Sequence, residues 1–130
     1  MIVDSSALLA ILFGEPDAAA YARAIVAAEG RKISAANWLE TAIRIDRGSG
    51  AIGSNAFDDL IREASIEVVP VTREQAQLAR AAYRAYGKGS GNPAQLNFGD
   101  CFAYALAKAT GEPLLFKGSD FAATDIQRGI

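Results

Sequence analysis

The sequence of 130 residues contains no histidine and a single cysteine, Cys101. Without histidine, the chain cannot use imidazole as an acid–base catalyst, form a Ser-His-Asp triad or bind zinc through histidine. One cysteine excludes an intrachain disulfide and a cysteine-rich metal site. Metal-assisted chemistry through oxygen ligands remains open to this chain.

The sequence also lacks strong net charge and long hydrophobic runs. A formal net charge of −2 argues against nucleic-acid binding through overall basicity, although a local basic rim remains compatible with it. The apolar run 7–13 is far shorter than the roughly 18 residues of a membrane span. No basic residue precedes that run, as an export signal would require, because the first one is Arg23. We expect a soluble cytoplasmic protein with one domain over residues 1–130.

Short apolar segments alternate with helical patterns along the chain. Strands are expected at residues 2–3, around Ile33, at 66–71 and 114–116, and near Ile126. Helices are expected over residues 7–13, 16–29, 35–47, 54–64, 72–86 and 98–110. In this assignment Gly48 ends the third helix and Ser54 caps the fourth. The alternation predicts an α/β fold with three layers, α/β/α, around a short central parallel sheet.

Four acidic residues lie at the ends of these elements or beside apolar segments: Asp4, Glu40, Asp100 and Asp120. Asp4 and Asp120 both follow predicted strands, and ligands of parallel sheets bind at the carboxyl ends of the strands. If the fold gathers the four carboxylates, their mutual repulsion favours a bound cation. Clustered carboxylate oxygens are ligands for Mg²⁺ or Mn²⁺.

Several of these acids also have an ordinary structural explanation. Asp4 can cap the helix that follows it, and Asp100 in a first helical turn is stabilised by the helix dipole. Glu40 precedes Arg44 by four residues, the spacing of a surface ion pair worth about 0.3–0.5 kcal/mol. The alternative places Glu40 at the metal and the neighbouring arginines at phosphate. The sequence pattern alone leaves both interpretations open.

Four segments carry a more specific signal: residues 2–8 (IVDSSAL), 39–42 (LETA), 96–107 (LNFGDCFAYALA) and 114–121 (LLFKGSDF). In this order they resemble the PIN domain and, more narrowly, the VapC-type toxins of bacterial toxin–antitoxin pairs. The resemblance covers essentially the whole chain. The segments around Asp100 and Asp120 are its most specific parts.

The resemblance implies an endoribonuclease that depends on Mg²⁺ or Mn²⁺ and hydrolyses RNA phosphodiesters with metal-activated water. It also implies a homodimer and a small antitoxin that covers the acidic groove. The implied catalytic and metal-binding residues are Asp4, Glu40, Asp100 and Asp120, with Ser6 and Asn97 as polar residues lining the site. Because the fourth acid is the least fixed in the family, Asp125 stays an alternative to Asp120.

Two other function classes are compatible with parts of the pattern. A phospho-receiver module also has a parallel sheet, an acidic Mg²⁺ pocket and a lysine after a late strand, here Lys117. Such a module needs an acid pair at the first strand, whereas Asp4 is followed by two serines. It also needs an aspartate ending the middle strand, and the segment 66–71 has none. The second alternative is a catalytically silent PIN-like module that only binds its partner.

Overall fold

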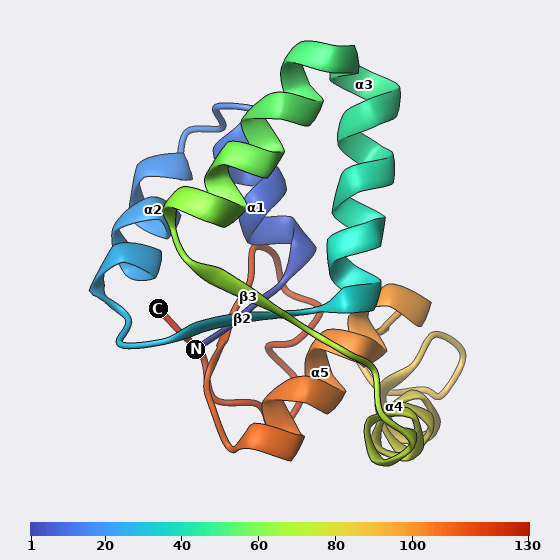
Figure 1. The fold of residues 1–130 in the computed structure, drawn as a ribbon. Helices are drawn as coiled ribbons and strands as arrows, with labels where there is room; N and C mark the ends of the chain where they lie inside the picture. Colours follow the sequence, from blue (N-terminus) through green and yellow to red (C-terminus); the bar gives the residue numbers. More distant parts are fainter.

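The computed structural model describes residues 1–130, and at its centre lies a four-stranded parallel sheet (Figure 1). Its strands are β1 (Ile2–Val3), β2 (Arg31–Ser34), β3 (Ile66–Val69) and β4 (Leu114–Leu115). They lie in the order β3-β2-β1-β4, and every pairing is parallel. The chain therefore adds strands on one side of β1 and later returns to its other side with β4. The strand order reverses between β1 and β4, where parallel sheets bind their ligands.

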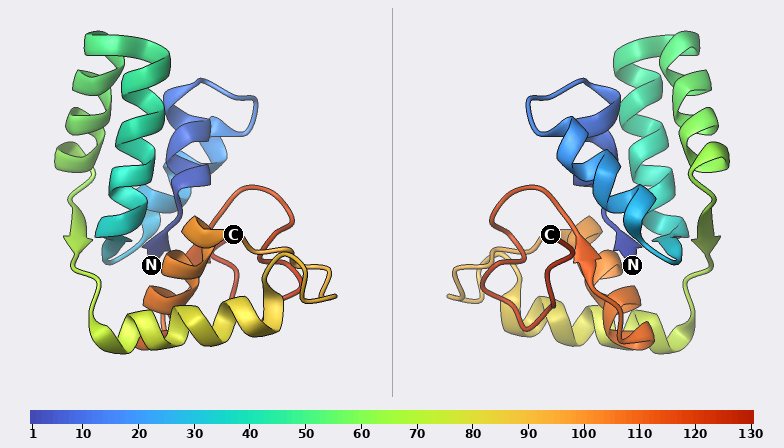
Figure 2. Two further views of the ribbon diagram at one scale, coloured as in Figure 1. Left: turned by 90° about the vertical axis from the view of Figure 1, so that its right-hand side faces the viewer. Right: turned by 90° about the vertical axis from the view of Figure 1, so that its left-hand side faces the viewer.

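Five helices cover the two faces of this sheet: α1 (Ser5–Leu12), α2 (Ala18–Ala27), α3 (Ala35–Glu63), α4 (Arg73–Tyr86) and α5 (Phe98–Thr110). The helices α1, α2 and α3 lie on one face, and α4 and α5 lie on the other (Figure 2). This arrangement confirms the three-layer α/β/α prediction. None of the helices is both long and apolar enough to cross a membrane.

The alternation of side chains along the short strands builds a separate core on each face. Ile2 and Leu114 point into the core shared with α4 and α5. Their neighbours Val3 and Leu115 point into the core shared with α1, α2 and α3. All four side chains are fully buried. Two-residue strands suffice here because each residue serves one of the two cores.

The structure corrects the prediction for α3. A helix ending at Gly48 and a second one capped by Ser54 were expected, but the kink lies at Gly50, whose φ of 60° and ψ of −147° are non-helical. Gly48 and Ser54 lie within the helical segments on either side of it. The positive φ is accessible to glycine at little cost. The two halves of α3 run back along each other as a helical hairpin (Figures 1 and 2).

Smaller corrections concern the ends of elements. The helix α1 begins two residues earlier than predicted, and α2 begins two residues later. The strand β3 ends at Val69, whose partner Ser34 is the last residue of β2. Pro70, the next residue, has no N–H to donate. The strand predicted near Ile126 is wrong, since that part of the chain forms one isolated bridge, between Leu114 and Arg128.

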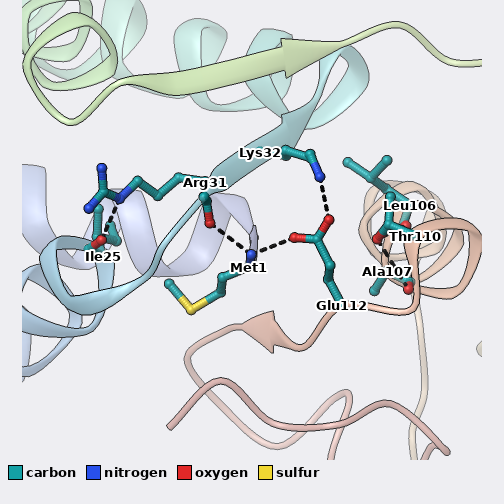
Figure 3. Close-up of polar contacts among 9 residues, drawn as sticks. Met1, Ile25, Arg31, Lys32, Leu106, Ala107, Thr110 and Glu112 are labelled. Carbon is teal, nitrogen blue, oxygen red and sulfur yellow. Dashed lines mark hydrogen bonds and ion pairs between the residues drawn. The ribbon is translucent and has the colours of Figure 1, made fainter.

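Ion pairs connect the strands at the amino-terminal edge of the sheet (Figure 3). The carboxylate of Glu112 accepts hydrogen bonds from the ammonium groups of Met1 and Lys32. Met1 directly precedes β1, Lys32 is the second residue of β2, and Glu112 lies two residues before β4. The cationic groups that anchor the strands thus lie at the edge opposite to the four candidate acids.

Candidate active site

The four acids predicted as a site line one pocket at the carboxyl-terminal edge of the sheet. Asp4 directly follows β1, and Asp120 lies in the loop after β4. Glu40 lies in α3 after β2, and Asp100 lies in the first turn of α5. The pocket has a volume of about 420 Å³ and also contains Ser5, Ser6, Leu9, Ile43, Arg44, Arg47 and Asn97. Asp4 and Asp120 follow neighbouring strands at the point where the strand order reverses.

Asp4 is both a helix cap and a wall of the pocket. Its Oδ2 accepts hydrogen bonds from the backbone N–H of Ser6 at 3.0 Å and from the Ser6 hydroxyl at 2.6 Å. The Ser6 hydroxyl oxygen in turn accepts the backbone N–H of Lys117 at 2.9 Å, which ties the end of β4 to Asp4. Burial raises the pKa of Asp4 to about 6 against the stabilising bonds from Ser6, and the charge of Glu40 adds to the rise.

Asp100 forms a reciprocal capping box with Asn97. The side-chain oxygen of Asn97 accepts the N–H of Asp100 at 2.8 Å, and Oδ2 of Asp100 accepts the N–H of Asn97 at 3.0 Å. Burial raises the pKa of Asp100 to about 7, with further contributions from the negative charges of Asp4, Asp120 and Glu40. A carboxyl group at a helix N-terminus normally ionises easily. Its pKa is raised here because burial disfavours the ionised form, and the charges of Asp4, Asp120 and Glu40 add to that effect.

Glu40 does not form the surface ion pair that its spacing to Arg44 allowed. Its Oε1 accepts a hydrogen bond from the Ser5 hydroxyl at 2.7 Å and one from Nδ2 of Asn37 at 3.3 Å. The guanidinium of Arg44 instead lies 6.0 Å from the ring centroid of Phe13. Of the two interpretations open from the sequence, the geometry supports the one that directs Glu40 into the pocket.

The two candidates for the fourth acid lie in different environments. Asp120 lines the pocket, and its charge contributes to the raised pKa of Asp100. Asp125 lies outside it and accepts hydrogen bonds from the Tyr104 hydroxyl at 2.7 Å and from Lys108 Nζ at 2.8 Å. The bonds from Lys108 and Tyr104 lower the pKa of Asp125. Asp125 is therefore part of a structural network, and Asp120 is the acid that joins the other three.

Lys117 is not positioned to neutralise the pocket. Its ammonium group pairs with the carboxylates of Glu15 and Asp17, in the segment between α1 and α2. None of the four pocket acids takes part in an ion pair. Lys117 therefore joins the segment after β4 to the segment between α1 and α2. The four carboxylates of the pocket have no ion-pair partner.

The chemistry of this pocket fits a hard divalent cation. Its donors are carboxylate, hydroxyl and amide oxygens, the ligand types that Mg²⁺ and Mn²⁺ prefer. No three acids of the chain lie close enough in this conformation to hold one ion together. The hydrogen bonds from Ser6 to Asp4 and from Ser5 to Glu40 hold these two side chains in their present positions. For three of these acids to hold one ion, their side chains would have to rotate within the pocket.

Sequence reasoning missed three residues that contact Glu40: Ser5, Asn37 and Gly99. Asn37 offers the clearest signal in retrospect. It lies three residues before Glu40, on the same helix face, and it interrupts an otherwise apolar stretch with a polar side chain. The contact with Gly99 joins α3 to α5 and has no local sequence signature.

Comparison with known proteins agrees with this geometry. The family model described as PIN domain matches residues 1–127. The chain belongs to the PIN domain family. This PIN-domain chain is 55% identical over 130 residues to Ribonuclease VapC28 of Mycobacterium tuberculosis, which covers 100% of this chain and 98% of that protein.

Solved structures show the same fold at low sequence identity. The VapC20 toxin of Mycobacterium tuberculosis, described as cleaving the sarcin-ricin loop, aligns with a TM-score of 0.77 at 18% identity, covering 96% of this chain and 95% of that chain. A toxin–antitoxin complex from Klebsiella pneumoniae aligns with a TM-score of 0.72 at 16% identity, covering 95% and 92%. The resemblance inferred from the sequence is confirmed, and membership of the PIN family excludes the phospho-receiver alternative.

Proposed function

We propose that this PIN-domain protein is a metal-dependent endoribonuclease and acts as the toxin of a toxin–antitoxin pair. One observation carries the proposal: four carboxylates without a paired cation line a single pocket at the switch point of the sheet. Identity of 55% to a protein named as a VapC ribonuclease supports the same activity. The raised pKa values of Asp4 and Asp100 also support the proposal, because buried carboxylates that lie close together ionise less readily when no cation is bound.

In this proposal Asp4, Glu40, Asp100 and Asp120 hold Mg²⁺ or Mn²⁺. When bound, the ion supplies Lewis-acid stabilisation of the phosphate charge and lowers the pKa of a water molecule. Ser6 fixes the orientation of the Asp4 carboxylate, and Asn97 fixes that of Asp100. The arginines at the rim of the pocket, Arg44 and Arg47, supply positive charge for the RNA backbone.

We further propose that a small antitoxin protein covers the acidic groove, that the chain forms a homodimer, and that it acts in the cytoplasm, where its RNA substrates are found. Large apolar side chains lie exposed close to the pocket, and such patches commonly form protein contacts. Leu39 is 52% exposed, Ile43 is 49% exposed and Phe98 is 78% exposed. All three line the same apolar depression beside Glu40.

The test is cleavage of RNA by the purified chain with Mg²⁺ or Mn²⁺. Since the chain has no histidine to drive attack by the RNA 2′-hydroxyl, the products should carry 5′-phosphate and 3′-hydroxyl ends, and EDTA should stop the reaction. Glu40→Gln should lower cleavage by about 100-fold or more while leaving the melting temperature unchanged or higher.

Two results would contradict this function. A primary product with a 2′,3′-cyclic phosphate, or full activity in EDTA, would refute the metal mechanism. Failure to cleave any RNA, together with intact binding of a partner protein, would favour the catalytically silent PIN module instead.

A further inference from the structure

The carboxylate of Glu40 lies directly against the backbone of Gly99. A Cβ atom at residue 99 would lie 2.1 Å from Oε2 of Glu40 and 2.8 Å from its Cδ. Only glycine therefore permits the observed position of this carboxylate. The atoms in conflict belong to the end of a flexible side chain, so a methyl group at residue 99 would displace the carboxylate and leave the helix backbone in place.

Two further side chains hold the same carboxylate. The Ser5 hydroxyl donates to Oε1 of Glu40 at 2.7 Å, from the first turn of α1. Asn37 is fully buried, and its Nδ2 donates to the carbonyl oxygen of Gly99 at 2.9 Å and to Oε1 of Glu40 at 3.3 Å. Three helices thus meet at one carboxylate: α1 through Ser5, α3 through Asn37 and α5 through Gly99.

Asn37 does not fit the role of an ordinary core residue. Its Oδ1 is buried without any hydrogen-bond partner, which costs free energy that an apolar residue in the same place would avoid. Both acceptors of its Nδ2, by contrast, involve the site: Glu40 itself, and the residue preceding Asp100. The amide therefore contributes to the arrangement of these two acids.

We propose that Gly99, Asn37 and Ser5 form a positioning set that fixes the Glu40 carboxylate beside Asp100. The inference rests on the proposed function, in which Glu40 contributes to cation binding. None of the three needs to touch the cation or the RNA. Their role is to fix the direction of one ligand, as residues around metal ligands commonly do.

Gly99→Ala tests the positioning role without removing any polar group. Alanine favours a helix more than glycine does, so the melting temperature of the metal-free variant should equal or exceed that of the wild type. Affinity for Mn²⁺ alone, measured by calorimetry, should fall about 10- to 100-fold, and RNA cleavage should fall by a similar factor.

The matched control is Gly48→Ala. Gly48 also lies in a helix, and the nearest atom to an added Cβ is a ring carbon of Phe13 at 4.0 Å. This variant should keep wild-type Mn²⁺ affinity and cleavage. Ser5→Ala is a second probe that keeps Gly99 and removes only the hydroxyl that donates to Glu40, and it should weaken Mn²⁺ binding in the same direction even if Gly99→Ala folds poorly.

A double-mutant cycle shows whether the effect passes through Glu40. In a Glu40→Ala background, Gly99→Ala should cause no further loss of Mn²⁺ affinity. With Glu40→Asp, whose shorter side chain avoids the added methyl group, Gly99→Ala should cost less than it does in the wild type. An equal loss in all three backgrounds would overturn the positioning role.

The same measurements separate this inference from the proposed function. Wild-type cleavage and Mn²⁺ affinity in Glu40→Ala would refute Glu40 as part of the site, and with it this part of the proposed function. Loss of both in Glu40→Ala, with wild-type values in Gly99→Ala and Ser5→Ala, would refute only the positioning set.

Discussion

Replacing Asp100 by asparagine should stabilise the metal-free protein at pH 8. The pKa of Asp100 rises from the ordinary value of 3.8 to about 7 because of burial and the neighbouring carboxylates. A rise of this size corresponds to about 4 kcal/mol of lost stability once the group is ionised in both states. Because water still reaches part of this side chain, we expect a gain of about 1–2 kcal/mol in Asp100→Asn.

The sign of the pH dependence follows from proton binding. Between about pH 4 and pH 7 the folded state holds a proton on Asp100 that the unfolded state has already released. The free energy of unfolding of the wild type therefore decreases as the pH rises through this window. The penalty is complete above about pH 7 and absent below about pH 4. Asparagine cannot ionise, so its advantage should appear at pH 8 and vanish in acid.

Urea unfolding in EDTA, followed by circular dichroism at about pH 8 and about pH 4, measures this difference. Adding Mg²⁺ at pH 8 should then stabilise the wild type and have little effect on Asp100→Asn. The matched control is Asp125→Asn, which should destabilise the protein at pH 8 because Lys108 and Tyr104 lower the pKa of Asp125. Destabilisation by Asp100→Asn at pH 8, or an equal gain at both pH values, would refute the electrostatic reasoning.

Two further predictions concern the fourth acid and the oligomeric state. Asp120→Asn should lower Mg²⁺-dependent RNA cleavage by about 10-fold or more, whereas Asp125→Asn should leave the initial cleavage rate of the folded protein unchanged. The opposite pattern would identify Asp125 as the fourth acid of the site. Light scattering of the purified chain should give twice the single-chain mass of 13.7 kDa, and Phe98→Lys should shift it toward one chain if this exposed ring lies in the dimer contact. A single-chain mass for the wild type at all concentrations would contradict the homodimer.

The elements that the sequence predicted well are those with strong local signals at both ends. The helix α5 spans the predicted residues 98–110, with the Asn97 cap at its start and Gly111, at a φ of 69°, at its end. The helix α4 covers almost all of the predicted range 72–86, and it follows Thr72, whose hydroxyl oxygen accepts the N–H of Gln75. Caps depend on residues within one turn of each other, so the sequence contains the whole interaction.

The kink in α3 could not be assigned in the same way. Three glycines lie close together at positions 48, 50 and 53, and any of them has the freedom to end a helix. After the kink, the second half of α3 runs back along the first half. Phe57 of the second half packs beside Trp38 of the first, with ring centroids 6.0 Å apart. This contact between the halves of the hairpin accompanies the turn at Gly50, and the local sequence does not reveal it.

For the site, the sequence by itself determined the available chemistry. It supplies carboxylates and no histidine, and it places Asp4 and Asp120 after strands, which indicated oxygen ligands for a hard cation at one sheet edge. Only the tertiary structure decided which partner each acid has. Glu40 accepts a hydrogen bond from Ser5 and does not pair with Arg44, and Asp125 accepts one from Lys108. The physical reason is that a carboxylate's partners and burial, and hence its pKa, depend on groups that folding brings from distant parts of the chain.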